Sequence, residues 1–185
     1  MILPIYAYGH PVLKKTGKLL NPGHEGLDEL IANMFETMYN AKGVGLAAQQ
    51  VGLNLRLFVV DTLQTDKEGE PPTGIKQVFI NTEILDDDSD DCTIEEGCLS
   101  IPEIRGEVDR PEKITVRFQD ESFNTFEKEF SGYNARVIQH ELDHNNGILF
   151  IEKLGPIKKQ LIRRKLEAIR KGQIISDYKI KFMPQ

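Results

Sequence analysis

The chain has 185 residues, of which 39% are hydrophobic and 28% are charged, so it can bury one core, and this composition argues against a mainly disordered protein. Two cysteines, Cys92 and Cys98, are too few for a secreted disulfide scaffold and favour a reducing compartment. The net charge is −6, but segment 156–172 holds seven basic residues and one glutamate, a net charge of +6 that leaves −12 for the remainder.

The apolar runs are too short to span a bilayer, and the N-terminal stretch lacks a signal-peptide pattern. We therefore expect one domain over 1–185, without a membrane partner. The first predicted element is an amphipathic helix over 27–40, whose apolar residues recur at helical spacing. Gly43 and Gly45 are expected to stop this helix.

The following segments alternate between strand and turn character. In chain order we expect a strand over 56–61, a polar loop over 63–74, a strand over 76–85, an acidic turn or exposed edge over 86–91, a hairpin of 113–120 and 125–130, a helix over 132–145 and a basic C-terminal helix over 156–172. Helices and strands do not alternate regularly. This order predicts an α+β fold, with mixed or antiparallel sheets packed around the 132–145 helix.

The 132–145 helix contains "QHELDH", with His140 and His144 one turn apart on one face and Glu141 beside them. Two imidazoles so placed can bind one divalent metal ion, and a catalytic site usually takes a third protein ligand. Phe150 stands where one class of metalloproteases has a third histidine, which excludes that class. The downstream carboxylates Glu152 and Glu167 stay open, although the cations around Glu167 favour an ion pair there.

Cys98 is the other candidate ligand, although a free cysteine is more often a small buried hydrophobe. Three blocks, "GVGLAAQQVG" (43–52), "EEGCLS" (95–100) and "QHELDH" (139–144), occur in this order. They resemble the signature blocks of peptide deformylases, metal hydrolases that remove the formyl group from N-formylmethionyl peptides. The resemblance implies Cys98, His140 and His144 as metal ligands and Glu141 as the catalytic carboxylate. It also places Gln50 at the active-site amide.

The family resemblance implies one divalent ion, Fe²⁺ as the natural metal, with Zn²⁺, Ni²⁺ or Co²⁺ able to occupy the site. We expect a metal-bound water as nucleophile, with Glu141 as general base and then acid. The side-chain amide of Gln50 and the backbone N–H of Leu99 are the expected oxyanion donors. The residues expected to bind substrate are Gly43, Val44, Gly45, Gly97, Arg105, Tyr133 and Val137.

The sequence departs from the family pattern at Thr82, where proline is frequent, and at Asn145, where an apolar residue is common. The resemblance implies a bacterial cytoplasmic enzyme acting on nascent peptides, with no DNA partner. It also implies docking of the basic 156–172 helix on ribosomal RNA. Two other functions stay open: an endopeptidase with Glu167 as ligand, and a non-catalytic RNA- or ribosome-binding module with an inactive metal site.

Overall fold

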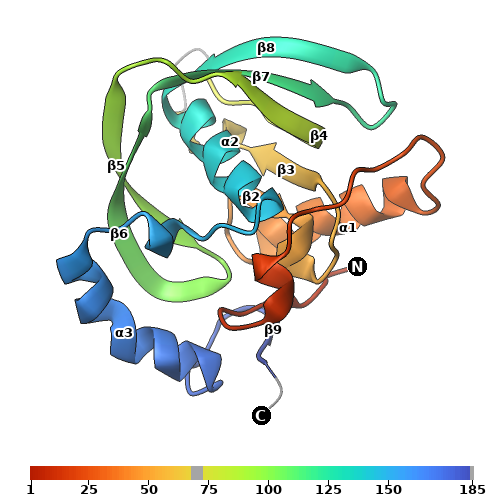
Figure 1. Cartoon of the computed structure of the whole chain (residues 1–185). Coiled ribbons are helices and arrows are strands. Elements are labelled where there is room, and N and C mark those ends of the chain that lie inside the picture. Colours follow the sequence, from red (N-terminus) through yellow and green to blue (C-terminus); the bar gives the residue numbers. More distant parts are fainter. Residues whose placement is uncertain (68–72, 184–185) are drawn as a thin grey trace.

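The computed structural model describes residues 1–67 and 73–183, and Figure 1 shows how the elements are arranged. The helices are η1 (Pro11–Lys14), α1 (Leu27–Asn40), η2 (Ala48–Val51), η3 (Leu63–Thr65), α2 (Gly132–Asn145), η4 (Phe150–Glu152) and α3 (Pro156–Arg170), where η marks a 3₁₀ turn. The strands are β1 (Ile5–Tyr6), β2 (Gly45–Ala47), β3 (Leu57–Asp61), β4 (Lys76–Asp86), β5 (Asp91–Cys98), β6 (Ile101–Pro111), β7 (Lys113–Gln119), β8 (Thr125–Ser131) and β9 (Ile180–Lys181). None of the helices described is long and apolar enough to cross a membrane.

The main sheet is antiparallel, with strand order β2-β3-β4-β7-β8. Strands β5 and β6 form a separate long hairpin, and β1 pairs in parallel with β9 to join the two ends of the chain. Helix α2 crosses the space between the main sheet and the hairpin (Figure 1) and packs against β2, β3, β7, β8 and β6. The predicted α+β class is therefore confirmed.

The apolar face of α2 explains its central place. Ala135, Ile138 and Leu142 recur at helical spacing and are buried against phenylalanines of the sheet, among them Phe58 and Phe79. The rings of Phe58 and Phe79 stack at 4.8 Å between centroids. Burial of these side chains fixes the rotation of α2, and the other face, which carries His140, Asp143 and His144, is thereby turned toward the β5–β6 hairpin.

Helix α1 matches its predicted bounds, but the predicted reason for its end is wrong. The left-handed residue after the helix is Lys42, with φ of 56°, while Gly43 and Gly45 have ordinary backbone angles. The N–H of Gly43 donates to the carbonyl of Met38 at 2.9 Å and that of Lys42 to Tyr39 at 3.0 Å, a Schellman-type end. The two glycines are therefore required for another reason, which lies in the cavity beside them.

The other predicted elements fall within a residue or two of the observed ones. The 113–120 and 125–130 segments form the expected antiparallel hairpin, β7–β8. The acidic 86–91 segment joins the end of β4 to the start of β5. Part of the predicted 63–74 loop, residues 68–72, lies outside the described residues.

Helix α3 ends at Arg170, two residues earlier than predicted, and packs against β6. Its apolar stripe is only partly buried, because Ile162 and Ile169 enter the core while Ile157 and Leu161 are 76% and 73% exposed. The exposed apolar pair thus shares the outer surface of α3 with the cationic side chains.

Candidate metal centre and catalytic cavity

Three metal-binding side chains converge between α2 and the end of β5. The donor atoms of Cys98, His140 and His144 all lie within 4.8 Å of one another, and Cys98 Sγ is 3.2 Å from His144 Nε2. No other cluster of this kind occurs among residues 1–67 and 73–183. The cluster can hold a metal ion, because two imidazoles and one thiolate with an open fourth position form a common catalytic ligand set.

The electrostatics of the cluster favour a positive charge between its donors. Burial lowers the pKa of His140, but the neighbouring Cys98 sulfur and Glu96 carboxylate outweigh it and raise that pKa well above its usual value. Burial and the positive charge of His140 lower the pKa of His144 well below its usual value. A divalent cation satisfies the same negative surroundings that raise the pKa of His140, so these residues fit a metal ion.

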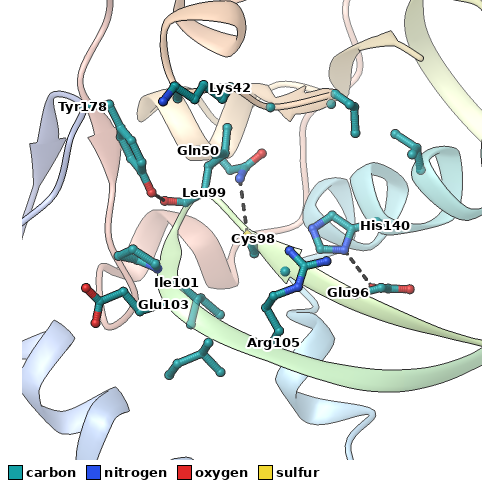
Figure 2. Close-up of a pocket in the computed structure, with 18 of the residues that line it drawn as sticks. Lys42, Gln50, Glu96, Cys98, Leu99, Ile101, Glu103, Arg105, His140 and Tyr178 are labelled. Carbon is teal, nitrogen blue, oxygen red and sulfur yellow. Dashed lines mark hydrogen bonds and ion pairs between the residues drawn. The ribbon is translucent and has the colours of Figure 1, made fainter. Parts of the chain in front are cut away.

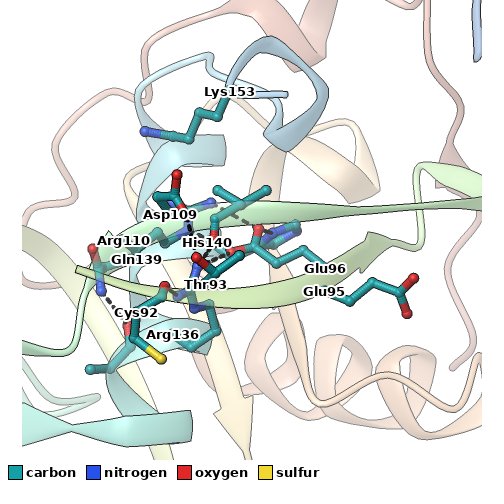
Figure 3. A network of polar contacts seen from close by, with 12 residues as sticks. Cys92, Thr93, Glu95, Glu96, Asp109, Arg110, Arg136, Gln139, His140 and Lys153 are labelled. Atoms are coloured by element: carbon teal, nitrogen blue, oxygen red, sulfur yellow. Dashed lines mark hydrogen bonds and ion pairs between the residues drawn. The ribbon is translucent and has the colours of Figure 1, made fainter. Parts of the chain in front are cut away.

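Glu96 contacts the Nδ1 side of the His140 ring, as Figure 3 shows. His140 Nδ1 lies 2.9 Å from Glu96 Oε2, which leaves Nε2 as the nitrogen available to a metal. Arg110 donates to both oxygens of Glu96 at 2.6 and 2.9 Å, and Arg136 donates to one of them at 2.9 Å. Arg110 also pairs with Asp143 of α2 at 2.6 Å. This buried network fixes the angle between α2 and the β5–β6 hairpin.

The charge of Glu96 is stable because of the same contacts. Although burial raises the pKa of Glu96, hydrogen bonds from Arg110 and His140 hold it well below its usual range. The sequence analysis missed Glu96, Arg110 and Arg136 as site residues. The position of Glu96, two residues before Cys98 in an alternating strand, is the one signal that could have indicated it.

Glu141 faces the cavity from α2. Its carboxyl is buried, and Oε2 has no hydrogen-bond partner among the described residues. Burial raises the pKa of Glu141 to about 7, which suits a group that accepts and then releases a proton near neutral pH. The backbone of Gly45 lies directly against this carboxylate, since an added Cβ at Gly45 would be 2.5 Å from Glu141 Oε1.

Gly45→Ala is therefore expected to displace the Glu141 carboxylate and lower kcat by about 10²-fold. The metal content should stay unchanged, because the three atoms nearest to the added methyl group all belong to Glu141 and not to a metal donor. Formate release and metal analysis measure the two effects. Gly155→Ala is the matched control, because its added methyl group meets nothing within 4 Å. A fully active Gly45→Ala variant would contradict the assigned position of the carboxylate.

Two expected hydrogen-bond donors also lie at the cluster. Gln50 is buried, and its Oε1 accepts from the N–H of Ala47 at 2.8 Å, so its Nε2 points to Cys98 Sγ at 3.5 Å (Figure 2). Leu99 follows Cys98 in the turn between β5 and β6. Gln50 therefore reaches the Cys98 sulfur through its side chain, while Leu99 is the next residue of the chain after Cys98.

A cavity of about 710 Å³ opens above the cluster. All seven residues expected to bind substrate line it, namely Gly43, Val44, Gly45, Gly97, Arg105, Tyr133 and Val137. Arg105 also forms an ion pair with Glu95 at 2.8 Å and lies over Gly97, where an added Cβ would be 3.0 Å from its guanidinium. The sequence analysis missed the C-terminal side of the cavity, formed by residues 175–178.

The alternative third ligands lie outside the cluster. Glu167 pairs with Arg170 at 2.7 Å and Lys171 at 3.4 Å, and hydrogen bonds from Arg170 help lower its pKa to about 2. Glu152 accepts from Lys14 at 2.7 Å and from the N–H of Leu149 at 2.8 Å. Both carboxylates are thus engaged in local contacts, and Cys98 is the residue whose donor atom lies with those of His140 and His144.

Comparison with known proteins gives consistent matches. Residues 2–160 match the family model described as polypeptide deformylase. The peptide deformylase of Flavobacterium johnsoniae is 46% identical over 98% of this chain and 96% of its own length, and that of Salinibacter ruber is 48% identical over 96% and 93%. A crystal structure of a peptide deformylase from Legionella pneumophila is 40% identical, with a TM-score of 0.81 over 94% of this chain and 98% of that one.

Proposed function

The chain belongs to the polypeptide deformylase family and removes the N-formyl group of nascent peptides, and from this premise we propose that the cluster of Cys98, His140 and His144 is its reaction centre. One observation carries this proposal. A buried carboxylate oxygen of Glu141, which has no hydrogen-bond partner within residues 1–67 and 73–183, lies next to the convergent donor atoms of Cys98, His140 and His144.

We assign one divalent ion to the three donors, Fe²⁺ in the first place, with Zn²⁺, Ni²⁺ or Co²⁺ as alternatives. The mixed set of a thiolate and two imidazoles suits all four ions. When bound, such an ion activates water and polarises the formyl carbonyl. Glu96 keeps Nδ1 of His140 engaged, so that Nε2 stays directed at the ion.

Glu141 moves the proton in this scheme. Its carboxylate takes a proton from the attacking water and delivers it to the leaving amine of the methionyl residue. The Nε2 group of Gln50 and the backbone N–H of Leu99 stabilise the oxygen of the formyl group as it becomes negative. The bond from the Ala47 N–H to Gln50 Oε1 fixes the amide in the donating orientation before substrate arrives.

The cavity walls select an extended N-terminal peptide. Val44, Tyr133 and Val137 provide apolar surface for the methionine side chain. Strand β2 is an edge of the main sheet, so its backbone near Gly45 is open to pairing with the substrate main chain. Gly43 and Gly97 also line the cavity, and the absence of a side chain there leaves room for Leu99 beside Gly43 and for Arg105 over Gly97.

Formate release from formyl-Met-Ala-Ser tests the proposed function directly. The metal-loaded protein should release formate and leave Met-Ala-Ser intact. Acetyl-Met-Ala-Ser is the control substrate, and its larger acyl group should be removed poorly or not at all. Absence of formate would indicate a non-catalytic module, whereas cleavage of an internal peptide bond would indicate the endopeptidase alternative.

We further propose that α3 docks on ribosomal RNA in the bacterial cytoplasm, where formylated chains emerge. Arg163, Arg164 and Lys165 are exposed and make no hydrogen bond or ion pair with the part of the chain that the structure describes. Three unpaired cations on an acidic protein favour phosphate contacts and counterion release. The exposed side chains of Ile157 and Leu161 on the same helix add apolar contact area.

Reversal of these three charges to glutamate is expected to weaken ribosome binding at least about tenfold at low salt and to flatten its salt dependence. Co-sedimentation with ribosomes over a salt series measures both effects. The matched control reverses Lys113, Arg117 and Lys128 on the β7–β8 hairpin, because these three cations are also exposed and lie on another element. Equal loss in both variants would contradict a specific role of α3.

A further inference from the structure

The turn between β5 and β6 carries the Leu99 N–H and is held from outside the hairpin. Cys98 and Ile101 form the last pair of the hairpin, so Leu99 and Ser100 are the two turn residues. The hydroxyl of Tyr178 donates to the Leu99 carbonyl at 2.6 Å, as Figure 2 shows, and the N–H of Tyr8 donates to the Ser100 carbonyl at 2.8 Å. Both carbonyls of the turn are therefore bonded to distant segments.

These two segments are one structural unit. Tyr8 follows β1 and Tyr178 precedes β9, and the parallel pairing of β1 with β9 joins them in the register Ile5 with Ile180. The small sheet at the chain ends therefore acts as a clamp on the turn. Neither hydrogen bond, from Tyr178 or from Tyr8, is made to one of the three metal-donor residues.

The side chain of Leu99 is confined on its other flank. An added Cβ at Gly43 would lie 2.7 Å from Leu99 Cδ1, so the side chain already touches the backbone there. Together with the bond from Tyr178, this contact leaves Leu99 little freedom to rotate. The Leu99 N–H belongs to the preceding peptide plane, shared with Cys98. Contacts on the carbonyl and side chain of Leu99 therefore act on this N–H by restricting the backbone angles of Leu99 before substrate binds, and an oxyanion donor needs such preorganisation.

We propose that Tyr178 is a positioning residue, whose hydroxyl holds the Leu99 carbonyl and thereby restricts the backbone angles of Leu99, so that the N–H on the other side of this residue stays aimed at the developing oxyanion; this inference rests on the proposed function. It gives the C-terminal segment a part in catalysis beyond forming one side of the cavity. A hydrogen bond to the main chain of the turn, rather than to substrate, performs this task.

Tyr178→Phe tests the proposal, because it removes the hydroxyl and keeps the ring. The variant is expected to lower kcat about tenfold and leave KM within about twofold, the pattern of an interaction that acts only in the transition state. Metal content and Tm should match the unmodified protein. Tyr6→Phe is the matched control, since it removes a hydroxyl from β1 whose hydrogen bond comes from Lys181 in the same small sheet and not from the β5–β6 turn.

Other outcomes would overturn the proposal. An unchanged kcat would show that the hydroxyl is dispensable, and a raised KM with unchanged kcat would assign Tyr178 to the cavity wall alone. Loss of metal would mean that Tyr178 acts through Cys98. The unmodified protein is measured in parallel, so that failure to release formate would count against the proposed function and not against the role of Tyr178.

Discussion

Glu141→Gln is expected to lower kcat for formate release by about 10²–10⁴-fold while leaving the bound metal in place. Glutamine has nearly the size and shape of glutamate, so the close contact with Gly45 is kept. It cannot accept a proton from water near neutral pH. The lower kcat would therefore report the loss of proton transfer. The substitution breaks no hydrogen bond of Oε2, because this atom makes none with the described residues.

The control for this experiment is Glu167→Gln, the same substitution at the carboxylate that the endopeptidase alternative assigns to the metal. Glu167 lies on α3 and pairs with Arg170, so its variant should retain both metal and turnover. Metal content and formate release are measured on both proteins. Retained turnover in Glu141→Gln would move the proton-transfer role to another group, and lost metal would show a structural role for Glu141.

The elements with regular apolar spacing could be predicted from the sequence, whereas the β5–β6 hairpin could not. In β6 the buried inward positions include Gly106 and Arg110 as well as Ile104 and Val108. The inward residue of β5 near the site is Glu96. An alternating strand that buries a carboxylate and a guanidinium lacks the apolar pattern by which strands are recognised. The charges of Glu96 and Arg110 neutralise each other only because the fold brings these two side chains together.

The residues of the site also divide into those that the sequence could predict and those that it could not. The proposed metal ligands and Glu141 lie within short motifs, and the order of three such motifs indicated the whole set. Tyr178 lies in a segment without periodicity, and its contact with Leu99 spans 79 residues of sequence, so no local pattern could indicate it. Such contacts depend on how the chain ends pack after folding.

Packing explains Asn145, one of the two departures from the family pattern, whereas nothing in the structure explains threonine in place of proline at position 82. Asn145 is buried at the end of α2, where its amide donates to Gln49 at 2.9 Å and to the Leu57 carbonyl at 3.2 Å. A polar residue is tolerated there because Gln49 supplies a buried acceptor. Thr82 is buried beside a register shift in β4, and its carbonyl accepts from Arg56 at 2.7 Å. Neither departure disturbs the donor cluster.

Cys98→Ala is the second prediction with a large effect, and it is expected to abolish formate release through loss of metal. Losing a residue that merely supports a ligand costs about 10–100-fold in metal affinity, so losing the ligand itself should cost at least as much. The remaining imidazoles of His140 and His144 belong to one helix and leave half of a tetrahedral site without protein donors. Elemental analysis after anaerobic dialysis measures the retained metal.

The other cysteine supplies the control, because the thiol of Cys92 lies outside the cluster on the same strand, β5. Cys92→Ala should keep both metal and turnover. The endopeptidase alternative predicts the opposite result for Cys98→Ala, which would then keep its metal through Glu167. Because Glu167 is held by Arg170 and Lys171 on α3, it cannot replace the thiolate without breaking both pairs. A Cys98→Ala protein that retains its metal would therefore overturn the assigned ligand set, whatever its activity.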